Sequence, residues 1–138
     1  MKIRPYTMKE REVIRYLLDD FYAYQKLIAL NSLIVENERI LSMSAICSKG
    51  EKNKAADDIN RLSSLASEAV QNLTKIRLDV YDTIYSIPDP EQRAVLSMKY
   101  LSHMSFDEIV EALPYQSKAT IIRRHLSGLE YLANRWNE

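Results

Sequence analysis

The sequence predicts an all-α protein in which a long antiparallel, coiled-coil-like helical hairpin is followed by a C-terminal three-helix helix-turn-helix unit. The 138 residues include only 2 Gly and 4 Pro, whereas 28% are charged, and this balance favours long helices. Apolar residues recur at helical spacing along most of the chain. No stretch alternates apolar and polar residues as a half-buried strand does.

The first helix is expected to run from about residue 7 to residue 43. Thr7 and Glu10 match the S/T-x-x-E pattern of a capping box, which marks a helix N-terminus. The apolar residues that follow at helical spacing give this helix a broad apolar face. Residues 44–54 contain Gly50 and clustered Lys and Ser residues, and we expect them to form the loop of the hairpin.

The second helix is expected over residues 55–86, and it carries the most regular apolar pattern of the chain. Its apolar positions alternate spacings of three and four residues, which is typical of a coiled-coil seam. We therefore expect residues 1–88 to form a hairpin domain that assembles the chain into a homodimer. The residues predicted to form this oligomerisation seam are Ile59, Leu62, Ala66, Ala69, Leu73, Ile76 and Val80.

The sequence Ile-Pro-Asp-Pro at residues 87–90 marks the predicted boundary between the hairpin and a second domain, residues 89–138. The proline-rich stretch cannot continue the preceding helix. Asp89 is a suitable N-cap for a new helix, and Pro90 suits its first position. The boundary therefore both ends the hairpin and begins the C-terminal unit.

Three short helices are expected after this boundary, over residues 90–101, residues 106–113 and from Ser117 to about residue 134. Ser105 and Glu108 form a second capping box at the start of the middle helix. Pro114 ends that helix because it lacks the amide hydrogen needed to continue it. Ser117 is a good N-cap for the last helix.

The last helix has two distinct faces, since each residue turns the helix by 100°. Its apolar residues and His125 fall on one side, where we expect them in the core, while Thr120, Arg123 and Arg124 fall on the other. In a helix-turn-helix, the N-terminal residues of the second helix reach base edges in the major groove, and Arg can pair bidentately with guanine. The residues predicted to contact double-stranded DNA are Gln116, Ser117, Lys118, Thr120, Arg123, Arg124 and Ser127.

The charge balance is mixed evidence for nucleic-acid binding. The whole chain has 19 basic and 19 acidic residues and no net charge, which argues mildly against a DNA-binding protein. Residues 115–135, however, carry four basic side chains and one acidic side chain. Such a locally positive surface would supply the salt-dependent part of binding to phosphate.

Four motifs follow one another after the boundary. They are Asp-Pro-x-x-Arg-x-x-Leu-x-x-x-Tyr from Asp89, Ser-Phe-x-Glu-Ile from Ser105, Leu-Pro-Tyr from Leu113 and Thr-Ile-x-Arg-x-His from Thr120. Together they resemble region 4 of bacterial sigma factors, and still more the small phage transcriptional regulators of the ArpU and RinA type. The resemblance extends at residue level over about residues 87–129. Pro114 departs from it, because the turn of the family usually has Gly there.

The resemblance implies a long N-terminal helical hairpin, a sigma-like helix-turn-helix and a role in activating phage late genes. It also implies that Thr120, Arg123 and Arg124 occupy positions that contact bases or phosphates. We therefore expect a sequence-specific, DNA-binding transcriptional regulator of phage or prophage origin, with host RNA polymerase left open as a further partner.

The sequence offers no chemistry that would favour an enzyme, a metal or a cofactor. The single cysteine, Cys47, cannot form an internal disulfide, and the two histidines lack metal-ligand spacing. No glycine-rich phosphate loop is present. No apolar run is long enough to span a membrane, and no signal-peptide pattern begins the chain, so we expect a cytoplasmic protein of a bacterial host cell.

Two other functions are consistent with the same pattern. A small terminase subunit, which serves phage DNA packaging, also joins a helix-turn-helix to oligomerising helices. A helical protein-interaction module without a DNA partner would fit the neutral net charge.

Overall fold

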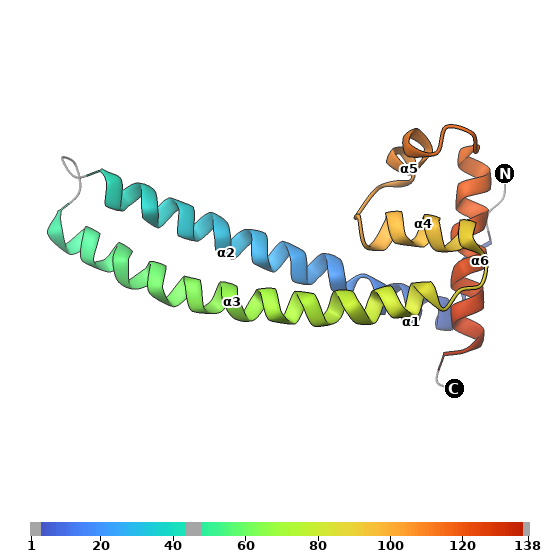
Figure 1. Ribbon diagram of the computed structural model, residues 1–138, viewed down its shortest axis with the longest axis horizontal. Coiled ribbons are helices and arrows are strands. Elements are labelled where there is room, and N and C mark those ends of the chain that lie inside the picture. The colour runs from blue at the N-terminus through green and yellow to red at the C-terminus, as the bar shows by residue number, and fades with distance from the viewer. Residues whose placement is uncertain (1–3, 44–47, 137–138) are drawn as a thin grey trace. The chain divides into compact units, whose positions relative to one another are not determined.

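The computed structural model is all-α, as predicted, and describes residues 4–43 and 48–136 (Figure 1). These residues form six helices and no strand. Their bounds are Met8–Leu17 (α1), Asp19–Ser42 (α2), Lys49–Tyr85 (α3), Pro90–Tyr100 (α4), Phe106–Ala112 (α5) and Lys118–Asn134 (α6).

The chain divides into two compact units, which we call the head unit and the hairpin unit. The head unit contains the residues up to Phe21 together with those from Ile76 onward, and the hairpin unit is Tyr22–Lys75. This division differs from the predicted boundary between residues 88 and 89. The physical reason is that α1 packs against α6, so the beginning of the chain belongs to the same core as its end.

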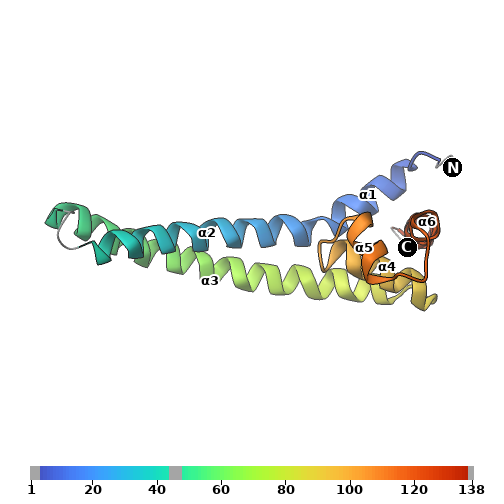
Figure 2. The same ribbon diagram turned by 90° about the horizontal axis from the view of Figure 1, so that it is seen from above.

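In the hairpin unit, α2 and α3 run antiparallel and side by side (Figures 1 and 2). The regular apolar seam of α3 is buried within this single chain: Leu62, Ala66, Ala69 and Leu73 are each less than one tenth exposed. The other predicted seam residues are Ile59 and Ile76, which are half-buried, and Val80, which lies in the core of the head unit. Their role in oligomerisation stays a prediction, but a second chain would find most of these side chains already covered.

Two helix boundaries differ from the prediction. The first helix is interrupted at Leu18, because α1 ends with Leu17 in the head core while α2 begins anew with Asp19 and Asp20 in its first turn. Acidic residues are favourable at a helix N-terminus. Helix α3 begins six residues earlier than expected, since the Ser48 hydroxyl accepts a hydrogen bond of 3.2 Å from the Glu51 amide. Most of the predicted loop is therefore helix, and residues 44–47, including Cys47, lie outside the described residues.

The main core of the head unit joins helices from both ends of the chain. Leu17 of α1, Ile84 of α3, Leu96 of α4 and Leu129 of α6 are fully buried in it. Burying a Leu or Ile side chain completely contributes about 1.5–3 kcal/mol. The N-terminal helix is therefore a structural part of the head unit.

A second cluster holds the three C-terminal helices together. Val95 of α4, Ile109 of α5 and Ile121 of α6 are fully buried against one another. The capping residues act as predicted: the side chains of Asp89, Ser105 and Ser117 accept backbone amide hydrogen bonds at the starts of α4, α5 and α6. The predicted helix-turn-helix arrangement of α5 and α6 is thus confirmed.

Gly128 allows α4 and α6 to approach closely. A Cβ atom at this position would lie 2.8 Å from Leu96 Cδ1 and 3.6 Å from Gln92 Cβ. Leu96 is fully buried and has little room to move. The other glycine, Gly50, has open space around it, with only Ser48 Oγ at 3.9 Å.

We predict that Gly128→Val lowers the free energy of unfolding by about 1–3 kcal/mol, the usual cost of overpacking a core. The matched Gly50→Val variant should stay within about 0.5 kcal/mol of the wild type, as surface substitutions usually do. Urea unfolding followed by circular dichroism measures both. Equal effects of the two variants would show that the α4–α6 approach is not tightly packed.

Candidate nucleic-acid interface

The N-terminal half of α6 presents the side chains that the sequence assigns to DNA. Ser117 caps the helix: its hydroxyl accepts the Thr120 amide at 3.1 Å and lies 2.9 Å from the Thr120 hydroxyl. Ile121 is fully buried in the cluster with α4 and α5, so the rotation of α6 about its axis is fixed. The opposite face, with Arg123 and Ser127, is exposed. The buried face of α6 is the one that the sequence predicts, whereas Arg124, predicted to face outward, is half-buried.

The three cationic residues in this half of α6 all have partners within the chain. Lys118 Nζ lies 2.8 Å from Asp107 Oδ1 of α5, and Arg124 Nη1 forms an ion pair with Glu91 of α4. Arg123 Nη2 donates a weak hydrogen bond of 3.4 Å to the Thr120 hydroxyl. Two of the three positive charges are thus balanced by carboxylates on neighbouring helices.

The structure separates the predicted DNA-contacting residues into two groups. Ser117, Lys118, Arg123 and Ser127 are exposed. The half-buried residues are Gln116, Thr120 and Arg124. In Gln116 the side-chain oxygen is buried, and in Arg124 the Nε atom is buried, so these two side chains point partly into the protein.

The buried face of α6 holds His125, which packs in the core as expected. Its Nε2 atom and the Tyr100 hydroxyl share a hydrogen bond of 2.7 Å. The rings of Tyr6 and Phe106 pack edge-on against the imidazole. Burial lowers the pKa of His125 to about 4 and raises the pKa of Tyr100. The pair is therefore uncharged near neutral pH.

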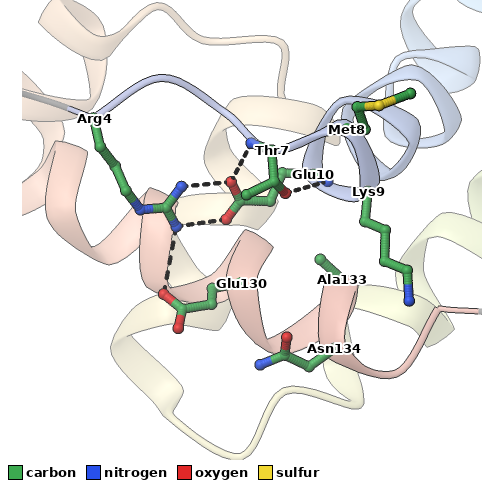
Figure 3. A pocket seen from close by; sticks show the side chains of 8 residues that line it. All are labelled: Arg4, Thr7, Met8, Lys9, Glu10, Glu130, Ala133 and Asn134. Atoms are coloured by element: carbon green, nitrogen blue, oxygen red, sulfur yellow. Dashed lines mark hydrogen bonds and ion pairs between the residues drawn. The ribbon is translucent and has the colours of Figure 1, made fainter.

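Arg4, which precedes α1, links α1 to α6 through two carboxylates. Local sequence patterns did not predict this feature. Arg4 pairs bidentately with Glu10, with both N–O distances at 2.7 Å, and reaches Glu130 of α6 at 3.4 Å (Figure 3). Glu10 is buried and also accepts the Thr7 amide, which completes the predicted capping box. The hydrogen bonds from Arg4 lower the pKa of Glu10 to about 2. Lys9 and Asn134 line the same open groove (Figure 3).

A polar cluster lies around Asp20, which is fully buried. No local sequence motif predicted this cluster. Arg77 of α3 donates two hydrogen bonds to its carboxylate, at 2.9 and 3.1 Å. His103, in the connection between α4 and α5, lies 2.6 Å from the same carboxylate. His103 has a φ of 56°, a left-handed conformation that costs energy for a residue with a Cβ. This cluster fixes the connection that leads into the helix-turn-helix.

The described part of the chain contains no group of three or more His, Cys, Asp or Glu side chains that could hold a metal ion. A search of the same residues finds no helix with the length and apolarity needed to cross a membrane.

The fold defines an all-α protein with a helix-turn-helix unit at its C-terminal end. By sequence, the chain belongs to the family described as "Protein of unknown function (DUF1492)", whose model matches residues 39–132. The match extends from the end of α2 through nearly all of α6. No curated protein and no solved structure matches the chain.

The buried His125 predicts acid sensitivity of the head unit. Its pKa is about 4 in the folded protein against about 6.5 when exposed, so between these values the unfolded state binds the extra proton. Stability is therefore complete above about pH 6.5 and falls as the pH drops towards 4. Linkage limits this loss to about 3 kcal/mol.

Urea unfolding of the wild type and of His125→Gln at several pH values between 7.5 and 4 tests this expectation. Gln can keep a hydrogen bond to Tyr100 but does not titrate. The difference in unfolding free energy between the two proteins should change across this range, while effects of other titrating groups cancel. Parallel stability curves would contradict a depressed pKa at His125.

Proposed function

We propose that this protein is a sequence-specific, double-stranded-DNA-binding transcriptional regulator that places α6 in the major groove. The finer assignment, to phage late-gene activators of the ArpU and RinA type, rests on the sequence motifs between residues 87 and 129. Contact with host RNA polymerase is part of the same proposal, because the motifs resemble region 4 of sigma factors.

The observation that carries the proposal is the outward face of α6, which lies opposite a fully buried core. Ile121 and Ile109 hold α6 against α5, while Arg123 and Ser127 face solvent one turn apart. A recognition helix needs this combination: a fixed orientation and polar side chains that reach base edges. Arg123 is the best placed residue for a base contact, since its side chain is exposed and donates a weak hydrogen bond of 3.4 Å to the Thr120 hydroxyl.

The carboxylates of Glu91 and Asp107 would compete with DNA phosphates for Arg124 and Lys118. Exposed ion pairs contribute little stability, about 0–1 kcal/mol each, so phosphates could replace them. On binding, Lys118 and Arg124 would exchange their carboxylate partners for DNA phosphates. Two positive side chains would then be available to DNA although the chain has no net charge. Together with the neutral net charge, the same pairs favour a protein-interaction module, in which they would simply stabilise the packing of α6.

We predict that Arg123→Ala weakens binding to the preferred DNA site by about 1–3 kcal/mol, the usual cost of losing a base contact. Selection from a promoter library followed by titration at two salt concentrations measures this effect. Arg135→Ala is the matched control, because Arg135 is an exposed arginine at the far end of the same helix, stacked over Tyr131. Equal losses for both variants would indicate only general electrostatic attraction, and no binding by the wild type would remove the proposal.

We also predict that Glu91→Gln strengthens binding by about 0.3–1 kcal/mol, since it releases Arg124 and removes a negative charge near phosphate. The added Arg124→Ala substitution should abolish this gain. Glu68→Gln in the hairpin unit changes net charge equally and serves as control. Unchanged affinity of Glu91→Gln would show that Arg124 has a packing role only.

A further inference from the structure

The turn that joins α5 to α6 (Figure 1) contains a tyrosine, Tyr115, whose side chain lies almost entirely in solvent. Tyr115 is 99% exposed, more than any other large apolar side chain that the structure describes, and Met8 follows at 80%. A side chain that buries no apolar area contributes no hydrophobic stabilisation to the fold. Tyrosine is also enriched where a protein surface meets another molecule. The turn therefore presents an aromatic side chain that does not pack within the chain.

The backbone on both sides of Tyr115 is held in place. The Gln116 amide donates a hydrogen bond of 3.1 Å to the Leu113 carbonyl, and Leu113 packs against the cluster that holds α4, α5 and α6 together. Pro114 restricts the backbone directly before Tyr115, because its ring fixes φ. Ser117 caps α6 directly after the turn. The Tyr115 side chain therefore extends into solvent from a defined point beside the start of α6.

The position of Tyr115 matters for the proposed binding of α6 in the major groove, on which this inference rests. The groove is about 12 Å wide, and an α-helix with its side chains has a diameter of about 10–12 Å, so the helix fills the groove. The chain that leads into the first turn of the helix must then pass close to the sugar-phosphate backbone at the wall of the groove. Tyr115 lies just before Lys118, the first residue of α6. Its side chain would therefore lie within reach of that backbone when α6 is bound.

The residues around Tyr115 suit a phosphate group. Residues 113–122 contain no acidic side chain, and Ser117 and Lys118 are both exposed. A tyrosine hydroxyl is an uncharged hydrogen-bond donor, and Tyr is among the side chains that bind DNA phosphates. Lys118 must leave the Asp107 carboxylate before it can bind a phosphate, whereas the Tyr115 side chain is already extended into solvent.

We propose that the Tyr115 hydroxyl donates a hydrogen bond to a DNA backbone phosphate at the edge of the groove that α6 enters. A contact of this kind carries no base information, but it fixes the register and the orientation of a protein on the duplex. Arg123, in the second turn of α6, faces the bases in the same arrangement. Tyr115 thus positions the helix from which Arg123 reads the sequence.

Titration of the full chain onto the selected DNA site and onto a duplex of scrambled sequence, at several salt concentrations, tests the proposal. Tyr115→Phe, which removes only the hydroxyl, should weaken binding about threefold to tenfold, the usual effect of one uncharged hydrogen bond. The loss should be equal on both duplexes, because phosphates carry no sequence information. It should also be equal at every salt concentration, because an uncharged donor displaces no counterion. Tyr22→Phe, at a tyrosine of the hairpin unit that is 60% exposed, is the matched control and should bind as the wild type does.

The possible failures of this experiment are distinguishable. If the wild type binds neither duplex, the proposed function fails and the Tyr115 contact fails with it. If Arg123→Ala weakens specific binding while Tyr115→Phe binds as the wild type does, only the inference about Tyr115 is overturned. A loss that shrinks as the salt concentration rises would indicate a charge effect, and it would overturn the proposed hydrogen bond as well.

Photochemical cross-linking provides a second test that does not rely on a loss of affinity. The full chain with p-benzoylphenylalanine in place of Tyr115 should become covalently attached to the DNA site on irradiation, whereas the chain with the same group in place of Tyr22 should not. Both positions are exposed, so both proteins should fold, which circular dichroism verifies. Cross-links from position 115 to a second protein copy, with none to DNA, would place Tyr115 in a protein contact and overturn the proposal.

Discussion

The head unit depends on one packing constraint: one face of α6 must be covered along its length by helices from both the N-terminal and the C-terminal parts of the chain. Leu129 and Leu132 of α6 meet Leu17 of α1 and Ile84 of α3 in one core. At the same time Ile121, two turns earlier, packs with α4 and α5. Because these contacts bury one face of α6 along its length, the opposite face is fixed outward. The candidate interface exists only because this core sets the rotation of the helix.

Positive side chains in this protein pair with nearby carboxylates, some buried and some exposed. The net charge of zero does not reveal this difference. Arg4 and Arg77 neutralise the buried carboxylates of Glu10 and Asp20, so these cations hold the fold together. Lys118 and Arg124 instead pair with exposed carboxylates, which cost little to replace. The same residue types therefore serve two purposes, and burial of the partner carboxylate distinguishes them. Buried pairs resist separation because an unpaired buried charge is strongly destabilising.

The apolar residues of the hairpin unit form two sets at helical spacing, one buried and one exposed. The regular seam of α3 is satisfied by α2 of the same chain, so the strongest apolar pattern in the sequence describes an intrachain contact. A weaker pattern, displaced by one position, leaves Ile28, Val35 and Val70 exposed. Periodicity alone indicates that a face is buried, but it does not indicate which chain buries it.

The sequence by itself determined the helical class, the helix-turn-helix and the cap residues Thr7, Ser105 and Ser117, because capping and periodicity act between residues a few positions apart. Only the tertiary structure decided the break at Leu18, the membership of α1 in the head unit and the partners of Arg124 and Asp20. These features depend on contacts between residues far apart in the sequence. The longest of the side-chain contacts described above, between Arg4 and Glu130, joins residues 126 positions apart. Long-range contacts of this kind depend on how helices pack, and no local pattern encodes them.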